Sequence, residues 1–87
     1  METDSRFTDF ILLQAQSAGL FLGQIPHPGT GKTAVNLAAA RSILDCLEML
    51  VTKTKGNLND EETKLLQSAL LNLTTLYSNI ERNSNDD

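Results

Sequence analysis

The sequence predicts an all-α protein of three helices. The second and third helices are expected to form an antiparallel hairpin, the first to pack across that hairpin, and a long loop to join the first two. Three stretches place apolar residues at helical spacing, separated by Gly, Pro and Asn, and no stretch alternates long enough to predict a central strand. A chain of 87 residues holds one domain with a modest core.

The first helix is expected to run from about Arg6 to Leu22. Asp4 or Ser5 can cap its N-terminus, and Gly23 and Pro26 end it. Its main apolar face should enter the core. That face consists of Phe7, Phe10, Ile11, Ala15, Ala18, Phe21 and Leu22.

The other two helices have clear limits. Asn36 is expected to cap the second helix, which runs to about Thr54, and Gly56 is expected to be the left-handed residue that follows. The third helix should begin after Asn59 and fray near Arg82. Because the segment between them, KGNLN, is short, the two helices should turn back on each other.

Both ends of the chain are polar. We therefore expect a flexible N-terminus at residues 1–4, a single helical domain at residues 5–82 and a disordered tail at residues 83–87.

Three carboxylates follow Asn59, namely Asp60, Glu61 and Glu62. A helix N-terminus attracts negative charge and repels cations, so these groups are interpreted as caps and not as a cation site. The Asn59 side chain is expected to accept from the first turn while Glu62 reaches back to the Asn59 amide.

Composition disfavours several functions. Seven Lys and Arg against eleven Asp and Glu give a net charge of -4, so no positive field attracts nucleic acid or an anionic membrane. The most apolar segment, residues 10–23, is interrupted by polar residues and is shorter than the ~20 residues that cross a bilayer. The acidic N-terminus is unlike a secretory signal, and the single cysteine, Cys46, indicates a cytoplasmic protein without an internal disulfide.

The stretch PGTGKT, residues 28–33, has the letters of a phosphate-binding loop. That loop requires Gly, four residues and then Gly-Lys-Ser/Thr, after a strand and at the start of a helix. Here Pro26 takes the place of the first glycine, a helix precedes the stretch, and the second helix begins only at Asn36. We therefore interpret the stretch as a turn.

Gln14 is a polar residue within the main apolar face of the first helix. A buried amide must find hydrogen-bond partners, so we expect it to hold the loop at residues 24–35 or to fix the register between subunits. The alternative function is a small-molecule or nucleotide-binding module built on that long loop. Its contacts would be Gln14 and Lys32.

The sequence contains no catalytic constellation. His27 sits between two prolines without a second histidine or an acid close by, and is interpreted as part of a surface loop. Cys46 has acidic neighbours instead of the basic group that activates a thiol, and is interpreted as a residue at the edge of the core. We expect neither an enzyme nor a bound cofactor or metal.

The first helix also carries apolar residues outside its main face. Leu13 and Leu20 lie roughly opposite that face, with Leu12 nearby. A three-helix monomer leaves them uncovered, which predicts a homo-oligomer, most simply a homodimer, or contact with an unknown protein partner. Isolated surface leucines such as Leu71 are also normal on monomers, so that alternative stays open.

The order of elements resembles a known family. The resemblance rests on Gln-Ile-Pro at residues 24–26, Val-Asn-Leu at residues 35–37 and Thr-Lys-Gly-Asn-Leu at residues 54–58. Over about residues 5–80 the chain resembles the short bacterial proteins grouped as DUF1844, a domain of unknown function. The resemblance implies that the nucleotide-like letters are a local variant of a helix connector, and it implies no activity. The expected function is that of a small non-catalytic helical protein acting through homo-oligomeric or protein–protein contacts.

Overall fold

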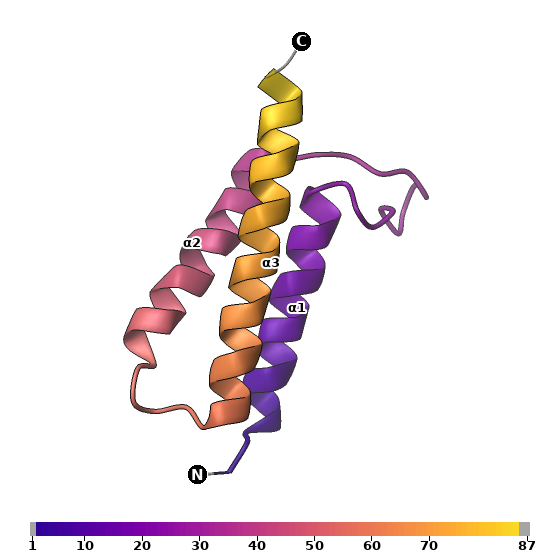
Figure 1. The fold of residues 1–87 in the computed structure, drawn as a ribbon. Coiled ribbons are helices and arrows are strands. Elements are labelled where there is room, and N and C mark those ends of the chain that lie inside the picture. Colours follow the sequence, from indigo (N-terminus) through magenta and orange to yellow (C-terminus); the bar gives the residue numbers. More distant parts are fainter. Residues whose placement is uncertain (1, 86–87) are drawn as a thin grey trace.

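The computed structural model describes residues 2–85, including the side chains of residues 2–83. It contains three helices, α1 (Ser5–Phe21), α2 (Leu37–Lys53) and α3 (Asp60–Asn85) (Figure 1). Within the described part there is no strand, and Leu22 and Val35 form an isolated antiparallel bridge. The prediction of an all-α protein with three helices is confirmed.

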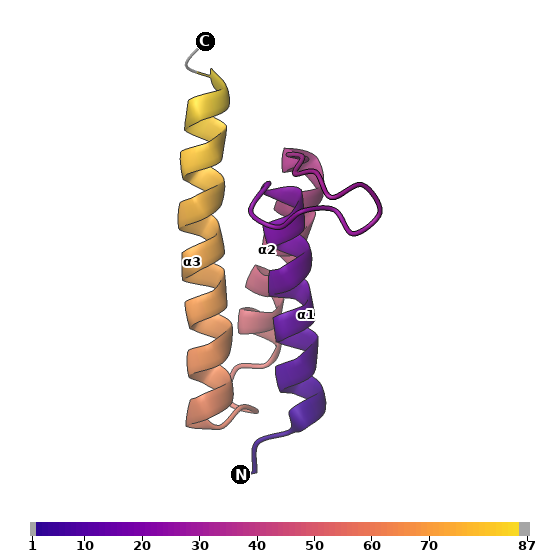
Figure 2. The same cartoon turned by 90° about the vertical axis from the view of Figure 1, so that its right-hand side faces the viewer.

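The three helices lie side by side and each packs against the other two. In Figure 1, α1 and α3 begin at the same end of the molecule, and α2 runs in the opposite direction to both. The molecule measures 47 × 28 × 16 Å along its principal axes. Because α3 is the longest helix, its C-terminal part extends beyond the other two (Figure 2).

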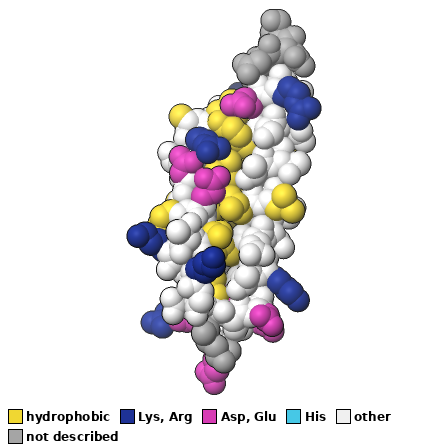
Figure 3. Space-filling view, turned by 60° about the vertical axis from the view of Figure 1, so that its left-hand side comes forward, with side chains coloured by type: hydrophobic (Ala, Val, Ile, Leu, Met, Phe, Trp, Pro, Cys, Tyr) yellow, Lys and Arg dark blue, Asp and Glu magenta, His cyan; other side chains and the backbone are white. Residues whose placement is uncertain are grey.

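The core lies where the apolar stripes of the three helices meet. Its buried members come from every helix and are Ile11, Ala18, Leu22, Ala40, Leu44, Leu47, Leu66 and Leu73. On the side of the molecule shown in Figure 3, apolar side chains form a band along its length with charged side chains on both sides. The side chains visible in this band lie at the outer edge of the core, since many apolar residues that pack against the core are only partly buried.

Phe10 does not belong to the core, contrary to the prediction. Its side chain is 43% exposed, whereas Ile11 and Ala18 are fully buried. At about 100° per residue, Phe10 is turned by that angle from Ile11, which lies at the centre of the buried stripe. Phe10 therefore lies at the edge of the stripe, where two neighbouring helices do not cover it.

The predicted helix ends are largely confirmed. The Asn36 side chain accepts a hydrogen bond of 3.0 Å from the Ala39 amide, as expected of an N-cap. Gly23 and Gly56 follow α1 and α2 with positive φ values of 75° and 84°, a conformation that favours glycine.

The third helix ends later than predicted. It continues through residues 83–85, past the expected end near Arg82. Tyr77 and Ile80 pack against the core, so the C-terminal half of the helix is held by tertiary contacts that helix propensity does not include. Residues 86 and 87 of the expected tail lie outside the described part, as does Met1 of the expected flexible N-terminus.

The core predicts which leucines matter for stability. We expect Leu44→Ala to lower the free energy of unfolding by about 2–5 kcal/mol, because it leaves a cavity among fully buried neighbours. Leu71→Ala, at a side chain 67% exposed, should change it by less than about 0.5 kcal/mol. Urea denaturation followed by circular dichroism measures both, and equal losses would contradict the assignment of the core.

Candidate interaction surface

Residues 23–34, here called the connector arm, form a loop whose two ends lie side by side, at the end of α1 and the start of α2. The Asn36 amide donates a hydrogen bond of 2.7 Å to the Phe21 carbonyl, and the Leu22–Val35 bridge lies beside it. Figure 2 shows the arm as a loop projecting from the end of the bundle. The chain is therefore already at the start of α2 where the arm begins, and the arm is longer than the connection between the helices requires.

The base of the arm is fixed against α1. The Gln24 amide donates to the Gly19 carbonyl at 2.9 Å, and its side chain donates to the Leu22 carbonyl at 3.2 Å. The Ile25 side chain lies directly over Gly19, since a Cβ atom placed there would be 3.0 Å from Ile25 Cδ1. These contacts hold the arm over the C-terminal half of α1.

The tip of the arm is a closed turn made by the PGTGKT stretch. Four consecutive amides, those of residues 29–32, find acceptors within the turn itself. The Gly29 amide donates to His27 Nδ1 at 3.3 Å, the Thr30 and Gly31 amides donate to the His27 carbonyl at 3.2 and 2.8 Å, and the Lys32 amide donates to Thr30 Oγ1 at 3.2 Å. A phosphate loop must point such amides at its ligand, so this turn lacks the donors that hold a phosphate.

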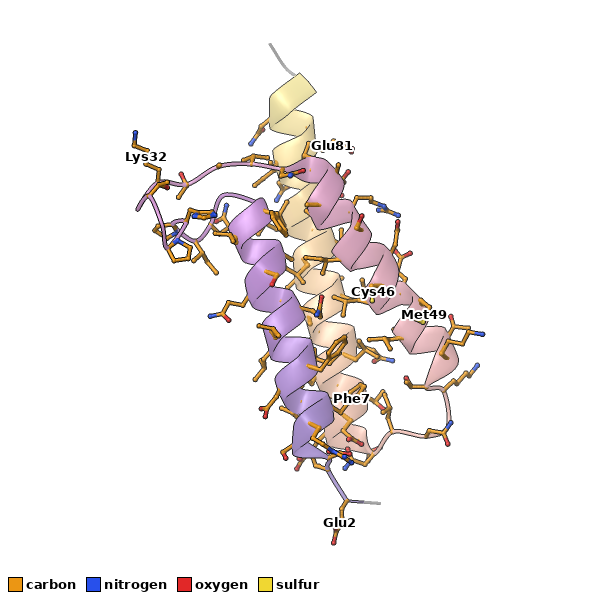
Figure 4. All side chains as sticks on the ribbon, turned by 180° about the vertical axis from the view of Figure 1, so that it is seen from behind. Glu2, Phe7, Lys32, Cys46, Met49 and Glu81 are labelled. Carbon is orange, nitrogen blue, oxygen red and sulfur yellow. The ribbon has the colours of Figure 1, made fainter. Side chains whose placement is uncertain are left out.

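The two residues expected to contact a nucleotide are not brought together. Lys32 extends away from the helices at the tip of the arm (Figure 4), whereas Gln14 lies partly buried on α1. The depressions found beside the arm include neither. One is lined by Gln16, Ser17, Leu20, Ile25, Pro26 and Pro28, and the other by Leu20, Phe21, His27, Ala34 and Asn36.

This geometry predicts that the turn does not bind ATP. We expect millimolar Mg-ATP to leave the amide resonances of residues 29–33 unshifted in ¹⁵N-correlated NMR spectra, because those of residues 29–32 are already hydrogen-bonded. Lys32→Ala should give the same result. Shifts confined to this turn in the wild type and lost in Lys32→Ala would show that nucleotide does bind there.

Several large apolar side chains remain uncovered on the outer face of α1. Leu12 and Leu13 are 52% and 56% exposed. Together with Asp9 and Gln16 they line an open depression of about 420 Å³. Five of the seven large exposed apolar side chains of the described part lie between residues 10 and 35, on α1, in the arm or next to it: Phe10, Leu12, Leu13, Ile25 and Val35.

Leu20 differs from the other two predicted surface leucines. Leu12 and Leu13 are exposed, whereas Leu20 is partly buried because the arm lies over it. It lines the two depressions between α1 and the arm. The larger of these, about 380 Å³, shares Gln16 with the depression at Leu12 and Leu13. The sequence predicted Leu20 on the same outer side of the helix as Leu13 and contained no sign that the arm would fold over it.

Gln14 does not form the buried hydrogen-bond network expected of it. Its side chain is partly buried, and the structure gives it no hydrogen bond to any described residue. Among the described side chains, no buried nitrogen or oxygen atom lacks a partner. The amide therefore retains access to water, which removes the expected desolvation cost.

Glu62 organises the opposite end of α1, away from the arm. Its backbone amide donates to Asn59 Oδ1 at 2.8 Å, and the Asn59 amide donates to Glu62 Oε1 at 3.0 Å, so the predicted capping box is confirmed. The second carboxylate oxygen accepts from the Asp4 amide at 3.0 Å. Glu62 is only 4% exposed. Because its two carboxylate oxygens bond to the Asn59 and Asp4 amides, it joins the start of α3 to the start of α1.

Residues 3 and 4 take part in this junction, although the sequence assigned them to a flexible N-terminus. The Thr3 hydroxyl donates to Glu61 at 3.0 Å, and the Asn59 side chain donates to Thr3 Oγ1 at 2.8 Å. Asp4 caps α1, and the Arg6 guanidinium bonded to its carboxylate at 2.9 Å lowers the pKa of Asp4 and has its own pKa raised. Contacts across 56 or more positions in the chain leave no local pattern in the sequence.

The junction predicts different roles for two adjacent glutamates. We expect Glu62→Gln to lower the free energy of unfolding by about 1–3 kcal/mol, because an amide group cannot accept on both of its heavy atoms and leaves one backbone amide unpaired. Glu61→Gln, at an exposed carboxylate that keeps an acceptor for Thr3, should cost less than about 0.5 kcal/mol. Denaturation curves compare the two, and faster hydrogen exchange at Asp4 in Glu62→Gln alone would locate the effect.

A further depression of about 370 Å³ lies between the end of α2 and the start of α3. It is lined by Val51, Thr52, Thr54, Lys55, Gly56, Leu58, Thr63, Leu66 and Gln67. The sequence did not single out this place, because its residues belong to two helices and the turn between them. It contains no described polar atom that is both buried and unpaired, so nothing there requires a ligand.

The side chains that could act in catalysis or bind a metal ion do not form a cluster among the described residues. His27 is exposed in the arm and Cys46 is partly buried on α2, as expected. Among residues 2–85, no three His, Cys, Asp or Glu side chains gather where they could hold a metal ion. Among the same residues, no helix has the length and apolar character needed to span a bilayer.

Comparison with known protein families identifies a relationship. A family model described as domain of unknown function (DUF1844) matches residues 4–79, which include α1, α2, the arm and most of α3. No curated protein and no solved structure matches the chain. The resemblance noted in the sequence is thereby confirmed, and it carries no activity with it.

Proposed function

The chain belongs to the DUF1844 family, whose function is unknown, and we propose that it is a non-catalytic protein acting through homo-oligomeric or protein–protein contacts. The contact surface is the outer face of α1 with the adjoining connector arm. The simplest occupant is a second copy of the chain, which makes the protein a homodimer.

One observation carries the proposal. Leu12 and Leu13 are more than half exposed, adjacent to each other, and beside a depression that the protein itself leaves open. Among the large exposed apolar side chains of residues 2–83, those away from α1 and the arm are Met49 and Leu71, single residues on α2 and α3. Grouped apolar residues on a small domain are typical of a contact surface, whereas single ones are ordinary.

We assign no enzymatic activity and no cofactor. His27 has no described hydrogen-bond partner with which it could act as a general base toward a nucleophile, since its recorded bonds are to backbone amides and carbonyls of its own turn. The single cysteine and the resemblance to short bacterial proteins favour a cytoplasmic, bacterial setting.

Size-exclusion chromatography with light scattering tests the proposal. At tens of micromolar the wild type should have about twice the 9.5 kDa mass of one chain. Leu12→Glu/Leu13→Glu should weaken association by about tenfold or more, because charges would have to be desolvated in the interface. The helical circular-dichroism spectrum should stay unchanged, since both side chains are exposed.

Leu71→Glu is the matched control. It introduces the same charge at an even more exposed leucine on α3, and it should leave the mass unchanged. A monomeric wild type would contradict the homo-oligomer. Equal weakening by Leu71→Glu would show that the outer face of α1 is not the specific contact.

A further inference from the structure

We propose that two copies pack about a two-fold axis with their α1 helices antiparallel, so that the connector arm of each copy covers the open depression of the other. This inference rests on the proposed function. It adds which part of the partner occupies the surface and in which orientation.

The shape of the surface supports this arrangement. Along the outer face of α1, the C-terminal half is overhung by the arm, and the depression between them is lined by Leu20, Ile25 and neighbouring residues. The N-terminal half, at Leu12 and Leu13, has no such cover. The surface is thus stepped, with a projecting arm at one end and an uncovered depression at the other.

A two-fold axis makes such a step complementary to itself. Both depressions include Gln16, so Gln16 marks the border between the covered and the uncovered half. An axis passing close to Gln16 and Ser17 places Leu13 of one copy opposite Leu20 of the other. It also brings the arm of each copy toward Asp9, Leu12 and Leu13 of its partner.

The charges distinguish this orientation from the parallel one. Residues 2–9 carry Glu2, Asp4 and Asp9 against the single Arg6, and residues 10–23 carry no charge. The arm carries Lys32 and His27 and no acidic residue. Antiparallel packing brings the acidic end of one α1 to the basic arm of the other, whereas parallel packing sets Asp9 against Asp9 and Lys32 against Lys32.

Within one copy these opposite charges are not paired. The ion pairs of the described residues are Arg6 with Asp4 and Arg41 with Asp45, so neither Asp9 nor Lys32 has an ionic partner among these residues. Asp9 lines the uncovered depression, and Lys32 extends outward from the arm (Figure 4). Both are therefore placed to act between copies.

Disulfide cross-linking decides the orientation. In a Cys46→Ser background, Leu13→Cys protein mixed with mass-tagged Ile25→Cys protein should give a mixed disulfide dimer under mild oxidation, because Ile25 belongs to the arm that covers the partner's depression and is itself exposed. Leu13→Cys alone should not link to itself, because the two residues would be offset by seven positions, roughly 10 Å along the helix, which is beyond disulfide reach.

The outcomes separate this inference from the proposed function. A dimer in which Leu13→Cys links to itself and the mixed dimer is absent would overturn the antiparallel arrangement and leave the homodimer intact. A dimer without any of these links would place the contact elsewhere and overturn the inference. A monomeric wild type would overturn both.

Charge reversal provides a second measurement that does not depend on cysteine chemistry. At low salt, Asp9→Lys and Lys32→Glu should each weaken dimerisation by about threefold, and the double variant should restore it. Water and salt screen ion pairs at exposed positions, so the change in dimer affinity is small. Sedimentation equilibrium at two salt concentrations is therefore the appropriate measurement. A double variant that dimerises no better than either single variant would overturn the pairing of acidic end and arm.

Discussion

The buried carboxylate of Glu62 joins the starts of two helices that are far apart in the sequence. It closes the cap of α3 on one oxygen and accepts the Asp4 amide at the start of α1 on the other. Two helix beginnings are thereby held at one end of the molecule. Because α1 and α3 begin at the same end of the molecule, α2 starts at the opposite end, where α1 finishes, and runs back to the start of α3.

The same constraint explains why the connector arm is a projection and not a bridge. With α1 ending beside the start of α2, the Asn36 amide reaches the Phe21 carbonyl directly, and the two helices need no long linker. Residues 23–34 are then held only at their base, by contacts with Gly19 and Leu22. A long loop that the fold does not require, and that is nevertheless internally hydrogen-bonded at its tip, is typical of a functional element.

Sequence reasoning was reliable where a feature is local. The caps at Asn36 and Asn59, the end of α1 at Gly23 and the positive φ of Gly56 depend on residues within a few positions of one another, and each was found as predicted. The interpretation of PGTGKT as a turn rested on Pro26 and the missing strand. The structure adds the physical reason, since the amides of residues 29–32 bond to His27 and Thr30 and are no longer free to bind a phosphate.

The sequence by itself determined the number of helices, their limits to within a few residues and the apolar stripe that each one buries. Helical periodicity and capping depend on residues that are close together in the sequence, which is why these features could be predicted. Only the tertiary structure decided that Phe10 is exposed, that the arm covers Leu20 while Leu12 and Leu13 stay open, and that Glu62 reaches Asp4. Those outcomes depend on which elements lie beside each other in space. A periodic pattern identifies the apolar face of a helix. Whether another element covers that face depends on how the whole chain packs.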